Sequence, residues 1–182
     1  MANFLLKKSY HTNNLKISKF RDLWGSHGVF TTIRLIGKPG KLVLFNNHII
    51  KLINSLKKYK IYSKHTEKNI KTLIGRNISN NLKYDHLFRI ALTKKLISIS
   101  IRKRYKPSNN FELKVLNYKR TDPKYKNLQY KYILKKLNSY DASKVDILLV
   151  YKKKILETCT SNLLLIKNNK CYSPKSNCYI GN

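Results

Sequence analysis

Acidic residues are scarce in this chain of 182 residues, which has 8 Asp+Glu against 39 Lys+Arg and a formal net charge of +31. Such a charge would attract nucleic acid, with an affinity that falls as salt rises. However, the excess is mostly Lys and is spread along the whole chain, whereas a phosphate-binding face would gather its cations and favour Arg. Lys, Asn, Ile and Tyr also share A/T-rich codons. We therefore rank nucleic-acid binding below an effect of base composition.

Cysteines and long apolar runs are also few. The three cysteines, Cys159, Cys171 and Cys178, are an odd number and do not make a disulfide scaffold. No apolar run approaches the roughly 18 residues that span a bilayer. The start of the chain lacks the apolar stretch and small-residue cleavage site of a signal peptide. The expectation is a reduced, soluble, cytoplasmic protein without a membrane partner.

The usual signatures of metal and nucleotide sites are missing as well. The cysteines contain no C-x-x-C pair and the five histidines are scattered without ligand spacing, so no metal site is predicted. There is no Gly-rich phosphate loop and no G-x-S-x-G elbow. The only glutamates are Glu67, Glu112 and Glu157, and none is close in sequence to another carboxylate. This spacing argues against acid/base chemistry by paired carboxylates.

The chain does hold enough apolar residues to bury a core, since 42% are hydrophobic and 13 are Tyr. Its length suits one ordinary domain or one and a half small ones. The apolar periodicity predicts, in order, a hairpin of 28–36 and 41–45, a helix after Asn46 or Asn47, a helix over 66–77, an antiparallel pair of 88–92 and 97–101, and a strand at 111–115. These elements predict an α+β domain over residues 1–120, with an antiparallel sheet and two helices against it.

The sequence Thr121-Asp122-Pro123 breaks this pattern and predicts a linker over 121–125. Residues 126–182 would then begin a second domain. Their periodicity predicts a helix from about 128 to 140 and strands over 146–151, 155–158 and 163–166.

Glu157 lies inside an apolar, strand-rich segment and is followed by the small polar residues Thr158-Cys159-Thr160-Ser161. A carboxylate in this place is either a surface residue at a strand end or a partly buried group with a cationic partner. The residues alone favour the surface interpretation.

The segment Glu157, Asn162-Leu163-Leu164-Leu165-Ile166, a turn at 167–170 and Ser173-Pro174 resembles the class IV aminotransferases. These fold-type IV enzymes use pyridoxal phosphate and include branched-chain aminotransferase, D-amino acid aminotransferase and aminodeoxychorismate lyase. Three further stretches agree with the family in order: Gly28-Val29-Phe30-Thr31-Thr32-Ile33-Arg34, His48-Ile49-Ile50-Lys51-Leu52, and residues 122–130. The likeness covers nearly all of residues 20 to 182.

The resemblance implies the α+β, two-domain fold of D-amino acid aminotransferase, with the cofactor-binding domain starting at 126. That second domain would be incomplete, because the family continues beyond the position of Asn182 into roughly a final third. The expectation is a C-terminally truncated chain with some apolar strands left exposed.

The resemblance also implies pyridoxal 5'-phosphate as cofactor and assigns roles to residues. Lys126 would be the catalytic lysine that forms the Schiff base and moves the α-proton, with Lys124 as the fallback. Glu157 would hold the pyridine nitrogen protonated. Tyr130 would donate to the ring hydroxyl, or would be a packed core tyrosine.

Three further residues complete the cofactor-binding set that the resemblance implies. Lys51 stands where the family has a phosphate-binding Arg; it keeps the charge and loses the forked geometry, and a solvated helix-face lysine is the alternative. Asn162 follows the Glu157 motif. Gly181 would approach the helix N-terminus that cradles the phosphate.

The expected function is a class IV aminotransferase acting on amino-acid and keto-acid substrates, with branched-chain amino acids among them. Aminodeoxychorismate lyase of folate synthesis is the alternative, and a basic nucleic-acid-binding protein without catalysis is the second alternative. The family's habit of pairing subunits implies a homodimer for the complete protein.

Overall fold

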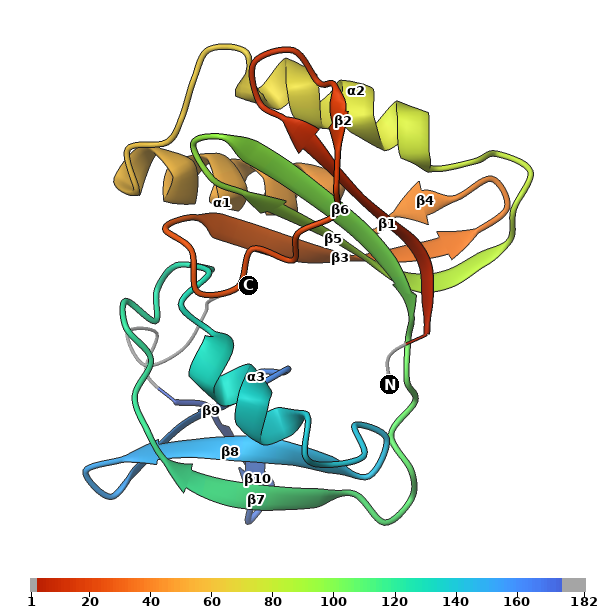
Figure 1. Ribbon diagram of the computed structural model, residues 1–182. Helices are drawn as coiled ribbons and strands as arrows, with labels where there is room; N and C mark the ends of the chain where they lie inside the picture. The colour runs from red at the N-terminus through yellow and green to blue at the C-terminus, as the bar shows by residue number, and fades with distance from the viewer. Residues whose placement is uncertain (1–2, 175–182) are drawn as a thin grey trace. The chain divides into compact units, whose positions relative to one another are not determined.

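The computed structural model describes residues 3–174. Its contacts divide the chain into two compact units, one ending at Arg104 and the next beginning at Tyr105. Both units combine a sheet with helix, as the α+β expectation requires (Figure 1). Among the described residues, no helix has the length and apolar character needed to cross a membrane.

The first unit is built on a six-stranded antiparallel sheet of order β2-β1-β6-β5-β3-β4. Both expected pairings, β3 with β4 and β5 with β6, are confirmed. Strand β1 was not predicted, because its sequence begins with three apolar residues and then two lysines and shows no alternation. The strands are β1 (Phe4–His11), β2 (Ile17–Ser18), β3 (Val29–Gly37), β4 (Lys41–Leu42), β5 (Tyr84–Leu92) and β6 (Leu96–Lys103).

Helices α1 (Phe45–Lys58) and α2 (Thr66–Asn77) cover one face of this sheet (Figure 1). Helix α2 has the predicted bounds. The prediction that Asn46 or Asn47 caps helix α1 is wrong, because both lie inside the helix, which begins at Phe45 after Leu44 in a left-handed conformation with φ of 52°. The buried residues that join helices and sheet include Leu52, Leu56, Ile70, Leu73, Phe88, Ile90 and Ile99.

The second unit has a three-stranded sheet of order β7-β8-β9. Strand β7 runs parallel to β8, and β8 pairs antiparallel with β9. A separate hairpin joins β10 and β11. The elements are β7 (Glu112–Asn117), α3 (Lys131–Leu137), β8 (Val145–Tyr151), β9 (Lys154–Thr158), β10 (Leu165–Lys167) and β11 (Lys170–Tyr172).

The parallel pairing of β7 with β8 explains why the second unit begins before β7. A parallel pair needs a crossover, and here the crossover contains α3. The strand expected at 111–115 therefore belongs to the second sheet, and the segment 121–125 leads from β7 to α3 inside that unit. Strand β7 leaves apolar side chains exposed, Val115 by 70%.

Candidate active site

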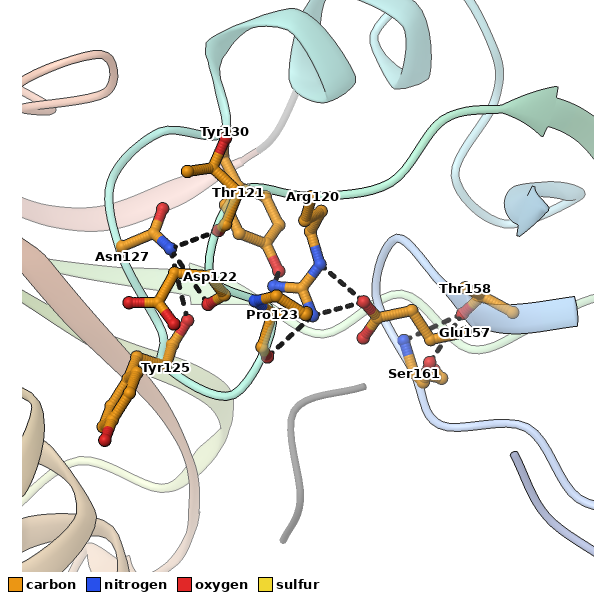
Figure 2. Close-up of polar contacts among 10 residues, drawn as sticks. All are labelled: Arg120, Thr121, Asp122, Pro123, Tyr125, Asn127, Tyr130, Glu157, Thr158 and Ser161. Atoms are coloured by element: carbon orange, nitrogen blue, oxygen red, sulfur yellow. Dashed lines mark hydrogen bonds and ion pairs between the residues drawn. The ribbon is translucent and has the colours of Figure 1, made fainter. Parts of the chain in front are cut away.

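The centre of the site is a buried ion pair in the second unit between Arg120 and Glu157 (Figure 2). Each residue is only 4% exposed. Arg120 Nε donates to Glu157 Oε1 over 2.5 Å, and Nη2 of the same guanidinium contacts that oxygen. A buried carboxylate needs a hydrogen-bonded cation. The surface interpretation of Glu157 is therefore wrong, and the buried acid with a cationic partner is the observed arrangement.

Tyr130 is the third member of this cluster. Its hydroxyl accepts a hydrogen bond from Arg120 Nη1, and the guanidinium carbon lies 4.9 Å from the centre of its ring. Burial raises the pKa of Tyr130 above its ordinary value, Arg120 opposes the rise and Glu157 adds to it. The hydroxyl thus keeps its proton at neutral pH, so Tyr130 can act there as a hydrogen-bond donor.

Asn127 closes the loop that leads into this cluster. Its side chain is 1% exposed, and Nδ2 donates to the carbonyl oxygen of Thr121 over 2.8 Å. The same amide reaches the carbonyl oxygens of Asp122 and Tyr125 at 3.4 and 3.5 Å (Figure 2). Asp122 has a φ of +50°, a left-handed conformation that Asp tolerates better than most residues. One buried amide therefore fixes the loop over 121–127.

Both candidate lysines belong to this loop. Lys126 is partly buried and directly precedes Asn127, whereas Lys124 is exposed. Tyr130 follows four residues after Lys126, so the loop links the lysines to the Arg120 cluster through a short stretch of chain.

A tight turn follows Glu157 and leads to Asn162. Thr158 Oγ1 donates to the carbonyl oxygen of Ser161 and accepts from the Ser161 backbone N–H, both over 2.9 Å (Figure 2). The Thr158 backbone N–H also donates to the Ser161 carbonyl oxygen over 3.1 Å. The turn fixes the path of the chain between the two motif residues. Asn162 itself is exposed.

The remaining candidates lie elsewhere. Lys51 is exposed on α1 of the first unit, and its carbonyl oxygen accepts a hydrogen bond from Ser55 Oγ. In the same unit a hydrogen bond of 3.0 Å joins Thr31 Oγ1 to His48 Nδ1, so residues of two motif stretches meet there. Gly181 lies outside the described residues. Within residues 3–174 no group of His, Cys, Asp and Glu could hold a metal ion.

The sequence prediction missed Arg120. The chain did carry a signal, since Arg120 is the only arginine after residue 104 in a region where every other basic side chain is Lys. An arginine in such a background indicates a need for several directed N–H donors, which a lysine cannot supply.

Comparisons with known proteins identify the family of this chain. Residues 28–181 match the family described as amino-transferase class IV. No curated protein sequence matches the chain. Three solved structures illustrate the shared fold, each at low sequence identity.

A branched-chain aminotransferase from Thermoproteus uzoniensis, solved with norvaline, aligns with a TM-score of 0.69 and 14% identity over 99% of this chain and 71% of its own. A 4-amino-4-deoxychorismate lyase from Pseudomonas aeruginosa gives a TM-score of 0.64 and 13% identity over 97% and 72%. A hypothetical aminotransferase from Mycobacterium tuberculosis, in its PLP-bound form, gives 0.63 and 11% over 97% and 74%. The chain belongs to the class IV aminotransferases, a family of pyridoxal-phosphate-dependent enzymes.

Proposed function

We propose that this chain binds pyridoxal 5'-phosphate and transfers amino groups between amino acids and keto acids. The observation that carries the proposal is the buried Glu157, held by Arg120 in a unit where most charge is positive and exposed. A buried ion pair adds little stability that packed apolar residues could not supply, so this one calls for a functional reason. The pyridine nitrogen of the cofactor, which needs a negatively charged partner when protonated, would supply that reason.

The residues of the second unit fit this cofactor. The positive charge of Arg120 compensates the negative charge of Glu157 inside the unit, so the acid can stay ionised although it is buried. An ionised carboxylate can accept a hydrogen bond from the protonated ring nitrogen of the cofactor. The bound ring then supplies a sink for the electrons released at the substrate's α-carbon.

Lys126 is the proposed catalytic lysine, which bonds to the cofactor and moves the proton at the substrate's α-carbon. An amine acts as nucleophile or base only when it is deprotonated. Lys126 is partly buried and its position is fixed by the Asn127 loop, whereas Lys124 is exposed. Lys124 shares the loop and is the alternative.

Tyr130 and Asn162 complete the proposed contacts in the second unit. Tyr130 keeps its proton and can donate to the ring hydroxyl, while Arg120 orients its oxygen. Asn162 directly follows the turn that Thr158 and Ser161 form after Glu157. Lys51 is the proposed cation for the cofactor phosphate, and Gly181 a proposed backbone contact to it.

Amino transfer on an amino acid, branched-chain amino acids included, is the proposed reaction, and the lyase reaction is its alternative. Structures named for both activities share this fold. The proposed working form is a homodimer in the cytoplasm. The two reactions differ in what they leave behind, because amino transfer converts the cofactor to its amine form and a lyase returns it unchanged.

An absorbance titration with pyridoxal 5'-phosphate tests the proposal. After gel filtration has removed cofactor held weakly by other lysines, the wild-type chain should keep the absorbance band of a lysine–cofactor adduct. Lys126→Ala should abolish the band and Glu157→Gln should weaken binding about tenfold or more, whereas Lys135→Ala, an exposed lysine of α3, should change nothing. Persistence of the band in Lys126→Ala and in Lys124→Ala would contradict the assignment. Loss of the band on adding leucine would favour the aminotransferase over the lyase.

A further inference from the structure

Asp146 is a second buried carboxylate in the same unit, 3% exposed at the start of β8. Its partners are all neutral. The Ile147 backbone N–H donates to Oδ1 over 2.7 Å, and Thr160 donates twice to Oδ2, from its backbone N–H over 3.2 Å and from its hydroxyl over 2.6 Å. No ion pair among residues 3–174 includes Asp146. Burying a carboxylate without a cation is costly, so this one needs a specific reason.

The strand register places the side chains of Asp146 and Glu157 on opposite faces of the sheet. Leu149 pairs with Glu157, and the Cys159 backbone N–H continues the ladder by donating to the Ile147 carbonyl oxygen over 2.9 Å. Leu148 pairs with Thr158, and successive side chains alternate between the faces of a strand, so Asp146 and Thr158 share the face opposite to Glu157. From that face Asp146 reaches Thr160, in the bend just beyond β9.

Two sets of hydrogen bonds therefore fix the four residues between Glu157 and Asn162. Asp146 holds Thr160 from β8, and Thr158 holds Ser161 across the turn. A shift of this turn would move the end of β9 and turn the Glu157 carboxylate away from Arg120.

We propose that Asp146 is a positioning residue whose carboxylate, through Thr160, fixes the turn after β9 and thereby holds Glu157 against Arg120. For the cofactor this inference rests on the proposed function of Glu157. The orientation of Glu157 can be measured without cofactor.

Three substitutions separate this role from simple packing. Asp146→Asn keeps the shape, but its single acceptor oxygen cannot serve both Ile147 and Thr160. Thr160→Val removes only the hydroxyl bond and leaves the carboxylate in place, so it tests the same link should Asp146→Asn fail to fold. Thr160→Ser keeps the hydroxyl and is its matched control. Asp141→Asn controls for loss of a carboxylate, because Asp141 is exposed and its side chain accepts hydrogen bonds from Ser143 within its own turn.

Proton exchange by NMR gives the first readout, on the chain without cofactor. Asp146→Asn and Thr160→Val should each speed exchange of the Thr160 backbone N–H and of the Arg120 Nε–H by about tenfold or more, since hydrogen bonds to charged groups are lost or loosened. Thr160→Ser and Asp141→Asn should keep wild-type rates. If exchange speeds up only at the backbone N–H of residue 160 and not at Arg120 Nε–H, Asp146 stabilises the turn without positioning Glu157, and the proposal is overturned.

Cofactor affinity gives the second readout. Where the wild type binds pyridoxal 5'-phosphate, Asp146→Asn should weaken binding about tenfold and Asp141→Asn should not. Equal affinity of Asp146→Asn and wild type would overturn the positioning role and leave the proposed function standing. If the Arg120 proton responds as expected but the wild type binds no cofactor, the proposed function fails and the positioning of Glu157 by Asp146 is supported.

Discussion

At the scale of single residues, Arg120 does what the many lysines of this chain cannot. Its Nε and Nη2 contact the Glu157 carboxylate while Nη1 donates to the Tyr130 hydroxyl. The same guanidinium reaches the Pro123 carbonyl oxygen over 3.4 Å. A lysine carries a point charge on a flexible stem and could not direct donors to these three partners at once. The fork geometry therefore explains an arginine at this one position.

The ion pair should be strongly coupled. Arg120→Met leaves the Glu157 charge buried and alone, so it should lower the free energy of unfolding by about 3–5 kcal/mol. The double variant Arg120→Met with Glu157→Met should lose much less than the sum of the two single changes. Urea denaturation measures each value. Additive losses would show that the two side chains do not interact, and Glu112→Gln, in the exposed pair with Lys114, should leave the urea midpoint unchanged.

Cys159 should be an unreactive thiol. Burial raises its pKa from the ordinary 9.0 to about 12, and the carboxylates of Asp146 and Glu157 add to the rise. Because the thiolate is the reactive form, iodoacetamide at about pH 8 should modify exposed Cys171 at least about tenfold faster than Cys159. Peptide mass spectrometry measures both rates, and equal rates would contradict the burial.

The same raised pKa has a consequence for stability. The folded chain favours the neutral thiol of Cys159, so its contribution is fully present below 9.0 and is lost as the pH rises from there towards about 12. Comparing the wild type with Cys159→Ala, the difference in unfolding free energy should shift against the wild type over this alkaline range. A difference that is constant with pH would contradict the shift.

At the scale of elements, the loop over 121–127 depends on one buried amide. Asn127→Ala removes the bonds to the Thr121, Asp122 and Tyr125 carbonyl oxygens. Trypsin should then cut first after Lys124 or Lys126, about tenfold faster than in the wild type. Asn138→Ala, at the exposed end of α3, is the matched control and should leave the cleavage rate unchanged. An unchanged first cut in Asn127→Ala would contradict the role of the amide.

A helix or strand could be predicted where the residues that determine it are close together in the sequence. Helix α2 was predicted from the sequence because Ile70, Leu73 and Ile74 lie at helical spacing and mark its apolar face. Strand β7 was recognised as a strand, but its partner was not, since a parallel pair with β8 joins segments about thirty residues apart through a crossover. Helix α3 begins at Lys131, later than expected, because the Asn127 side chain bonds its own loop and accepts from the Gln129 backbone N–H just before the helix.

The residues of the site differ in the same respect: a local motif marks some of them, and only the fold brings the others together. Glu157 could be selected from the sequence because a motif of fixed local spacing surrounds it. Its partner Arg120 lies 37 residues away, and only the folded unit brings the two together. Asp146 and Thr160 are 14 residues apart and depend likewise on the register of β8 and β9.

At the scale of the whole chain, the net charge of +31 is the dominant feature. Mutual repulsion of so many cations should destabilise the folded state at low ionic strength. Raising NaCl from about 10 mM to about 300 mM shortens the screening length from about 30 Å to below 10 Å, so the thermal midpoint should rise. Sucrose of equal osmolarity controls for solvent effects. A midpoint that falls with NaCl would contradict net repulsion.

The proposed site requires Lys126 to bond to the cofactor that Glu157 holds. Reduction with borohydride in the presence of pyridoxal 5'-phosphate, followed by peptide mapping, tests it directly. We expect one predominant label, on Lys126 with Lys124 as the alternative, and a marked loss of labelling in Glu157→Gln. Label distributed over exposed lysines of both units, unaffected by Glu157→Gln, would contradict the account.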